Sequence, residues 1–199
     1  MNPRTNPRVL LYAHGFRSSS RSRKAGELRA ALSENPDFKL VTPDLDPRPA
    51  QAISQLQWHA LGLAPQHLTL LGSSLGGFYA WVLAEKIGCR AVLLNPSLRP
   101  YETLLHHTGA QTNLHTGVAF EFPGAYLDEL RAFAPRGVSR PARYLVVVEM
   151  GDELLDHRTT LDKFSGANHI VIEGGNHDLA SFPAQIPAIL EFCRSAGQP

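Results

Sequence analysis

The chain has 199 residues, of which 43% are hydrophobic, and a formal net charge of +1. This is enough chain to bury one sizeable core, and one domain over residues 1–199 is expected. The near-zero charge gives no general reason to expect binding to nucleic acid or an anionic membrane, and two cysteines are too few for a disulfide framework.

The first eight residues, Met1 to Arg8, lack the apolar stretch of a signal peptide. No apolar run approaches the roughly 20 residues that a membrane-spanning helix needs. We therefore expect a soluble cytoplasmic protein.

Apolar runs and helical stretches alternate along the chain. The apolar runs are mostly continuous, which is typical of strands buried on both faces of a parallel sheet. The predicted strands are 9–12, 38–41, 67–71, 91–94, 144–148 and 169–172. The predicted helices are 22–32, 49–61, 75–87, 156–164 and 184–194. This alternation predicts a doubly wound α/β fold.

The loop after the first predicted strand reads Ala13-His14-Gly15-Phe16-Arg17. Its position predicts that the backbone N–H of Phe16 forms one half of an oxyanion hole. For His14, a structural role in bonding the backbone of this turn is favoured over proton transfer.

A basic segment follows, running from Arg17 to Lys24 and including Arg21 and Arg23. A solvated surface is the favoured interpretation, because most runs of charge are solvated. The alternative is a site for an anion on the substrate, such as the phosphates of an acyl-coenzyme A.

Residues Gly72-Ser73-Ser74-Leu75-Gly76 match the pattern G-x-S-x-G between a predicted strand and a predicted helix. Such a turn exposes its serine at the end of a sheet, and the glycines leave room for the helix to fold back on the strand. Ser74 is therefore the predicted nucleophile, and the N–H of Leu75 is predicted to be the second oxyanion donor.

No strand is evident from Ser97 to Pro141, although Tyr126 to Phe133 reads as helical. A connection this long is usually functional, so we interpret residues 97–141 as a small lid over the strand ends. His106, His107 and His115 lie in it without carboxylate spacing that would complete a metal site, and no metal is expected.

A serine hydroxyl needs a base, and the base needs an acid to orient it. Asp152 follows the fifth predicted strand and His177 follows the sixth, so both can reach the edge of the sheet where Ser74 lies. Asp156 is the alternative acid, with a competing role as a helix cap. Glu153 is expected to be solvated, and Asp178 to be a charge at a helix start.

Five segments together resemble the bacterial YqiA-type esterases of the α/β-hydrolase superfamily. They are 11–19, 72–80, 95–102, 151–156 and 173–177. The resemblance implies a compact α/β-hydrolase fold with sheet order 2-1-3-4-5-6. It also implies a serine hydrolase acting on acyl esters or thioesters, with Ser74, Asp152 and His177 as its triad and no cofactor. Residues Thr103 to Pro135 match the motifs of the family least. Substrate choice is therefore the property that can least be carried over from the family to this chain.

The favoured function is therefore hydrolysis of a small-molecule acyl ester through an acyl-enzyme. An acyl-coenzyme A thioesterase or acyltransferase using the same triad is the nearest rival. A non-catalytic binding protein on the same fold is a rival of another class, although binding requires no such triad.

Overall fold

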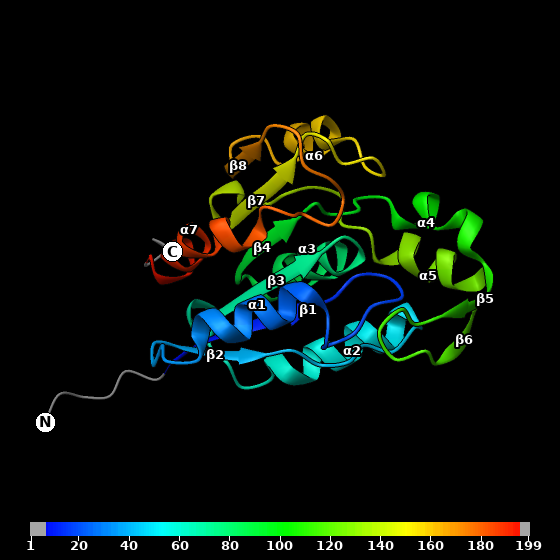
Figure 1. Ribbon diagram of the computed structural model, residues 1–199, viewed down its shortest axis with the longest axis horizontal. Helices are drawn as coiled ribbons and strands as arrows, with labels where there is room; N and C mark the ends of the chain where they lie inside the picture. Colours follow the sequence, from blue (N-terminus) through cyan, green and yellow to red (C-terminus); the bar gives the residue numbers. More distant parts are fainter. Residues whose placement is uncertain (1–6, 196–199) are drawn as a thin grey trace, which may run out of the picture.

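Six strands of the chain pair side by side in one parallel sheet (Figure 1). The computed structural model describes residues 7–195. The strands lie in the order β2-β1-β3-β4-β7-β8, which is 2-1-3-4-5-6 when only the strands of this sheet are counted. The predicted order is therefore confirmed. The strand bounds are β1 Arg8–Ala13, β2 Phe38–Val41, β3 Leu68–Ser73, β4 Arg90–Leu94, β7 Tyr144–Glu149 and β8 Asn168–Ile172.

Helices cover both faces of the sheet, as the alternation of the sequence predicts. Those longer than four residues are α1 Arg23–Leu32, α2 Pro49–Ala60, α3 Leu75–Ile87, α5 Ala125–Phe133, α6 His157–Lys163 and α7 Phe182–Arg194. A single turn, α4 Pro100–Thr103, and three 3₁₀ turns at Pro65–His67, Leu105–His107 and Pro141–Arg143 join them.

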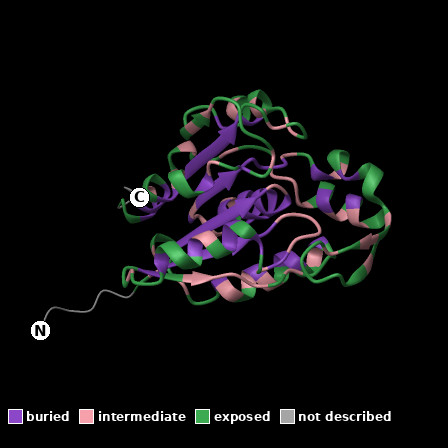
Figure 2. Ribbon diagram, in the orientation of Figure 1, coloured by how far each residue is buried: buried purple, intermediate pink, exposed green. Residues whose placement is uncertain are grey.

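The strands divide the core in two, because successive side chains of a strand point to opposite faces. In β1, Leu10 and Tyr12 pack with helices α1 and α7 on one face. Val9 and Leu11 pack with α2 and α3 on the other face. Strands β3, β4 and β7 and helix α3 are mostly buried (Figure 2). This buried scaffold holds the strand ends in place.

The insertion segment, residues 97–141, lies beyond the carboxyl ends of the strands (Figure 1). It contains α4, α5 and an antiparallel hairpin of β5 Gly109–Thr112 and β6 Ala119–Phe122. The expectation that it holds no strand is wrong. Each strand has only four residues, and only Phe122 of the hairpin is buried. Neither strand therefore has the continuous apolar run by which the buried strands of the main sheet are recognised. Helix α5 agrees with the predicted helix to within one residue.

The last helix begins at Phe182, two residues before its predicted start. Asp178 nevertheless lies in a turn that precedes this helix and not at a helix start. No helix among residues 7–195 is both long and apolar enough to cross a membrane. Residues 1–6, part of the stretch interpreted as lacking a signal peptide, lie outside the described residues.

Candidate active site

Loops from four strands meet at the carboxyl edge of the sheet. Ser74 follows β3, Asp152 follows β7, and His177 follows β8, while Phe16 lies in the loop after β1. All strands of a parallel sheet end at the same edge, so the fold brings together residues separated by more than 100 positions.

Ser74 occupies a strained turn between β3 and α3. Its φ of 55° lies in the left-handed region, which costs free energy for a residue with a side chain. A Cβ atom on Gly72 would lie 2.0 Å from the carbonyl oxygen of Gly76, and one on Gly76 would lie 2.0 Å from that of Ala13. The two glycines therefore allow the backbone to pass close enough for this turn to form.

The side chains of Ser74, His177 and Asp152 form one hydrogen-bonded chain. His177 Nε2 lies 3.0 Å from Ser74 Oγ, and His177 Nδ1 lies 2.8 Å from Asp152 Oδ2. A carboxylate can only accept, so Nδ1 carries the proton and Nε2 accepts from the hydroxyl of Ser74. This places a base against the hydroxyl and an acid behind the base.

Asp152 is held by more than His177. Its Oδ1 accepts hydrogen bonds at 2.9 Å from the backbone N–H groups of Leu154 and Leu155. Its side chain is only 2% exposed, against 19% for His177. Burial acts to raise the pKa of Asp152, but the hydrogen bonds from His177 and these amides outweigh it, so the pKa is lowered.

The other acids have different partners. Asp156 is the N-cap of α6 and accepts from the N–H of Arg158 at 3.0 Å. Glu153 accepts from the backbone N–H of His177 at 2.9 Å. Neither carboxylate hydrogen-bonds the imidazole of His177 within the described part of the chain.

Phe16 lies in the loop after β1, Leu75 is the first residue of α3, and both line the same cavity as Ser74. Neither backbone N–H has a hydrogen-bond partner among residues 7–195. His14 supports this loop, since its Nε2 accepts from Leu45 N–H at 3.0 Å and its Nδ1 donates to the carbonyl of Gly15 at 3.0 Å. Burial lowers the pKa of His14, which favours this neutral ring.

A cavity of about 200 Å³ opens beside Ser74 and His177. Its apolar walls come from Phe16, Leu75, Leu104, Leu154 and Leu155, and its remaining walls from Ser97, Thr103 and His107. The insertion segment therefore contributes to the site. No group of three His, Cys, Asp or Glu side chains able to hold a metal ion occurs within residues 7–195.

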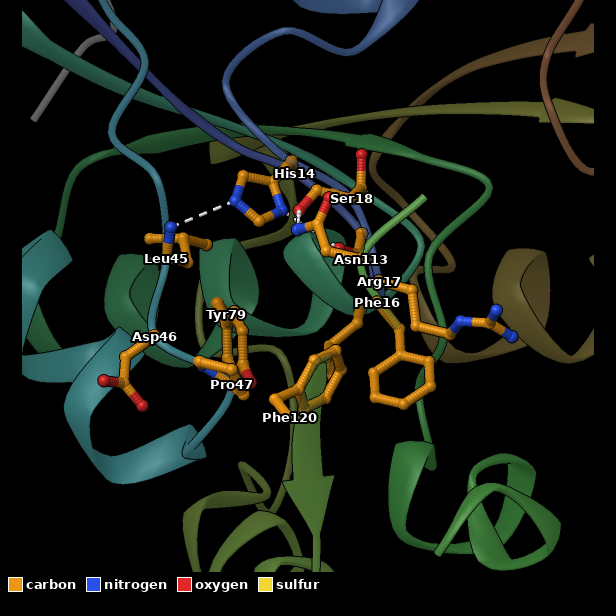
Figure 3. A pocket seen from close by; sticks show the side chains of 12 residues that line it. His14, Phe16, Arg17, Ser18, Leu45, Asp46, Pro47, Tyr79, Asn113 and Phe120 are labelled. Atoms are coloured by element: carbon orange, nitrogen blue, oxygen red, sulfur yellow. Dashed lines mark hydrogen bonds between the residues drawn. The ribbon is translucent and has the colours of Figure 1, made fainter. Parts of the chain in front are cut away.

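A second cavity, of about 40 Å³, lies against the same loop (Figure 3). Phe16 and Leu75 line both cavities, so they form a common wall. The ring of Phe120 lies beside that of Phe16, and Asn113 lies next to Ser18 (Figure 3). Hairpin β5–β6 thus reaches the loop that carries the Phe16 amide.

Two residues with no role assigned from the sequence hold the His177 loop, although Asn95 is the first residue of the motif segment 95–102. Glu149, fully buried at the end of β7, accepts from the N–H groups of Asn176 at 2.6 Å and Ser181 at 2.8 Å. Asn95, at the end of β4, donates to the carbonyls of Asn176 and His177 and accepts from Glu149 N–H. The sequence offered one signal for each, a polar side chain directly after an apolar run.

The basic segment divides between two environments. Lys24 is buried and lies 2.9 Å from Asp178, and Arg23 lies 3.2 Å from the same carboxylate. Burial lowers the pKa of Lys24, against the opposing effect of Asp178. Arg17 bonds the carbonyl of Thr112. Arg23 and Lys24 therefore anchor the turn after His177. The interpretation of the segment as solvated is wrong for Lys24, which is buried, whereas Arg23 is exposed.

The sheet order and the position of each loop define the α/β-hydrolase fold, and solved structures agree. A protein from Agrobacterium vitis S4 superposes with a TM-score of 0.71 at 15% identity, covering 96% of this chain and 90% of that one. The esterase domain of a Rhodothermus marinus protein gives 0.66 at 18% identity, covering 97% and 90%. Est1E from Butyrivibrio proteoclasticus, with ferulic acid bound, gives 0.65 at 16% identity, covering 96% and 89%.

Within this fold, the chain belongs to the uncharacterised protein family UPF0227, whose family model matches residues 9–194. This is the YqiA-like family, so the resemblance drawn from the sequence motifs is confirmed.

Proposed function

We propose that the protein is a serine hydrolase that cleaves acyl esters through an acyl-enzyme. The observation that carries this proposal is the hydrogen-bonded chain from Ser74 Oγ through His177 to Asp152. The α/β-hydrolase fold that it shares with structures named as esterases supports the assignment as an analogy of fold.

In the first step, Ser74 Oγ attacks the acyl carbonyl while His177 Nε2 takes the hydroxyl proton. Asp152 stabilises the imidazolium that forms. The amides of Phe16 and Leu75 donate to the developing oxyanion, and Leu75 does so from the positive end of α3. The imidazolium then gives its proton to the leaving oxygen.

In the second step, His177 takes a proton from water, and the hydroxide attacks the acyl-Ser74 carbonyl. Collapse of this intermediate returns the proton to Ser74 Oγ and releases the acid. The five apolar residues that line the cavity favour an apolar acyl group over a charged one, because burying an unpaired charge is costly.

A panel of aryl esters with increasing acyl length, run beside acyl thioesters of the same lengths, tests this function. We expect hydrolysis of at least one aryl ester by the wild-type protein and a loss on the order of 10⁶ in turnover for Ser74→Ala. Thr116→Ala, on the exposed turn of the hairpin, is the control. Preference for thioesters would favour a thioesterase. No turnover of any donor would favour a binding protein.

A further inference from the structure

We infer that Asn113, in the turn of hairpin β5–β6, is a positioning residue for the oxyanion loop, residues 15–18. It acts through a hydrogen bond to the carbonyl of Ser18. This inference rests on the proposed function, because it concerns the placement of the Phe16 amide.

Three hydrogen bonds join the hairpin to the oxyanion loop. Asn113 Nδ2 donates to the carbonyl of Ser18 at 2.6 Å (Figure 3). The N–H of Leu114 donates to the carbonyl of Arg17 at 2.8 Å. Arg17 Nε returns a bond to the carbonyl of Thr112 at 3.0 Å. Contacts between segments 95 residues apart are made only in the folded protein.

The orientation of the Asn113 amide is determined by its own turn. Its Oδ1 accepts from the backbone N–H groups of His115 at 2.9 Å and Thr116 at 3.0 Å. With the oxygen occupied in this way, the NH₂ group faces the carbonyl of Ser18, which can only accept. Asn113 therefore has two separable roles, as an acceptor inside the turn and as a donor to the loop.

The oxyanion loop needs such external support. Arg17 has a φ of 57°, a left-handed conformation that residues with a side chain adopt at a cost in free energy. Within the loop, the turn bond from Ser18 N–H to the carbonyl of Gly15 is long, at 3.3 Å. The contacts from the hairpin therefore support this backbone at Arg17 and Ser18, as His14 does at Gly15.

The same hairpin also fixes the side chain of Phe16. Its ring lies 4.9 Å from the ring of Phe122 and 6.1 Å from that of Phe120, both edge-on and both in β6. The Phe16 amide is thus held between a packed ring and a hydrogen-bonded backbone. An oxyanion donor stabilises the transition state only when it is held within about 0.5 Å of its productive position.

The inference predicts that Asn113→Asp and Asn113→Ala both lower kcat. Asn113→Asp keeps the oxygen that accepts hydrogen bonds inside the turn, but it places a second oxygen against the carbonyl of Ser18. It should therefore lower kcat at least as much as Asn113→Ala. We expect a fall of about 10- to 100-fold, below the 10²–10³ for removal of an oxyanion donor. KM should stay within about threefold, because the contact acts on the transition state.

Two further variants complete the series. Arg17→Met removes the bond to Thr112 while keeping a long side chain, and should lower kcat less than Asn113→Asp. Thr116→Ala alters the same turn without touching the loop and should leave kcat within about twofold of wild type. The rate of labelling by a fluorophosphonate should fall in step with kcat, because its oxygen enters the same hole.

The outcomes separate the inference from the function on which it rests. A wild-type protein that is neither labelled nor active overturns both. If the wild type is labelled and active but Asn113→Asp keeps the wild-type kcat, only the positioning role is overturned. If, in addition, Asn113→Ala has a lowered kcat, Asn113 acts only within its own turn. The positioning role is also overturned if Thr116→Ala lowers kcat as much as the Asn113 variants do. It is likewise overturned if the Asn113 variants change only KM and leave kcat at the wild-type value.

Discussion

The carboxylate of Glu149 accepts a hydrogen bond from the backbone N–H of Asn176 at 2.6 Å, one residue before His177. The strand that leads to Asp152 therefore also holds the loop that carries His177. A Cβ on Gly175 would lie 2.1 Å from Glu149 Oε2, so the glycine at this position lets the loop approach the carboxylate. The relative placement of Asp152 and His177 depends on this buried contact.

Glu149→Gln should lower the free energy of unfolding by about 1–3 kcal/mol near neutral pH. The amide keeps one acceptor oxygen, but its NH₂ group would face the N–H of either Ser181 or Asn176, and that hydrogen bond is lost. Turnover should fall as well, since the His177 loop is displaced. Urea unfolding and ester hydrolysis of the same preparations measure the two effects. A variant with wild-type stability would contradict the anchoring role.

The same pair predicts a pH dependence. Burial acts to raise the pKa of Glu149, but hydrogen bonds from Ser181 and Asn176 outweigh it and hold the pKa below its ordinary 4.5. A group whose pKa is lower in the folded state stabilises the fold fully above its unfolded pKa and loses this contribution as the pH falls through the folded value. The difference in the free energy of unfolding between wild type and Glu149→Gln should therefore become smaller below about pH 4.5. A larger difference in the free energy of unfolding below this pH would contradict a lowered pKa of Glu149 in the folded protein.

The sheet and the elbow could be predicted because their signals are local. The run from Leu68 to Ser73 is buried throughout, and the glycines that flank Ser74 act within a few residues of it. The anchoring by Glu149 could not be predicted, because it depends on partners 27 and 32 residues further on. An acid at the end of an apolar strand looks like the point where the chain returns to solvent.

Asp152→Asn should lower turnover by about 10⁴ with little change in stability. Its oxygen can still accept from Leu154 and Leu155, but its NH₂ would face His177 Nδ1. The ring would then carry its proton on Nε2, where it cannot take the proton of Ser74. Asp156→Asn should cost little, because asparagine is also a good N-cap. Steady-state kinetics of both variants decide the matter, and the opposite ranking would make Asp156 the acid.

Gly72→Ala should destabilise the protein by several kcal/mol or prevent folding, because its Cβ would lie 2.0 Å from a backbone oxygen. Gly26→Ala in α1 is the matched control. No heavy atom lies within 4 Å of its added Cβ, and alanine should stabilise the helix by about 0.5–1 kcal/mol. Thermal unfolding compares the two, and equal midpoints would refute the steric account of the elbow.

Asp178→Ala should lower the free energy of unfolding by about 1–3 kcal/mol, because the buried Lys24 ammonium loses its carboxylate partner. Asp128→Ala removes an exposed pair with Arg131 at 3.6 Å and should change stability by less than about 0.5 kcal/mol. Denaturant unfolding measures both. If Asp178→Ala is as mild as its control, Lys24 does not anchor the turn after His177.

The hairpin shows why the substrate side of the site is harder to predict than the scaffold. Residues of β5 alternate between half-buried and exposed, and β6 buries only Phe122. Asn113 bonds a loop 95 residues earlier, and no periodicity within the hairpin reveals that contact. The residues that surround a reacting group are selected by long-range geometry, whereas the strands that carry them are selected by local hydrophobic pattern.

The most direct test of Ser74 as the nucleophile is the intact mass and peptide map of the protein after reaction with a fluorophosphonate. We predict one adduct per chain, on the peptide that contains Ser74. It should be absent from Ser74→Ala and strongly slowed in His177→Gln, with both variants folded by circular dichroism. An adduct that persists in folded Ser74→Ala, or a wild-type protein that takes up none, would contradict the account.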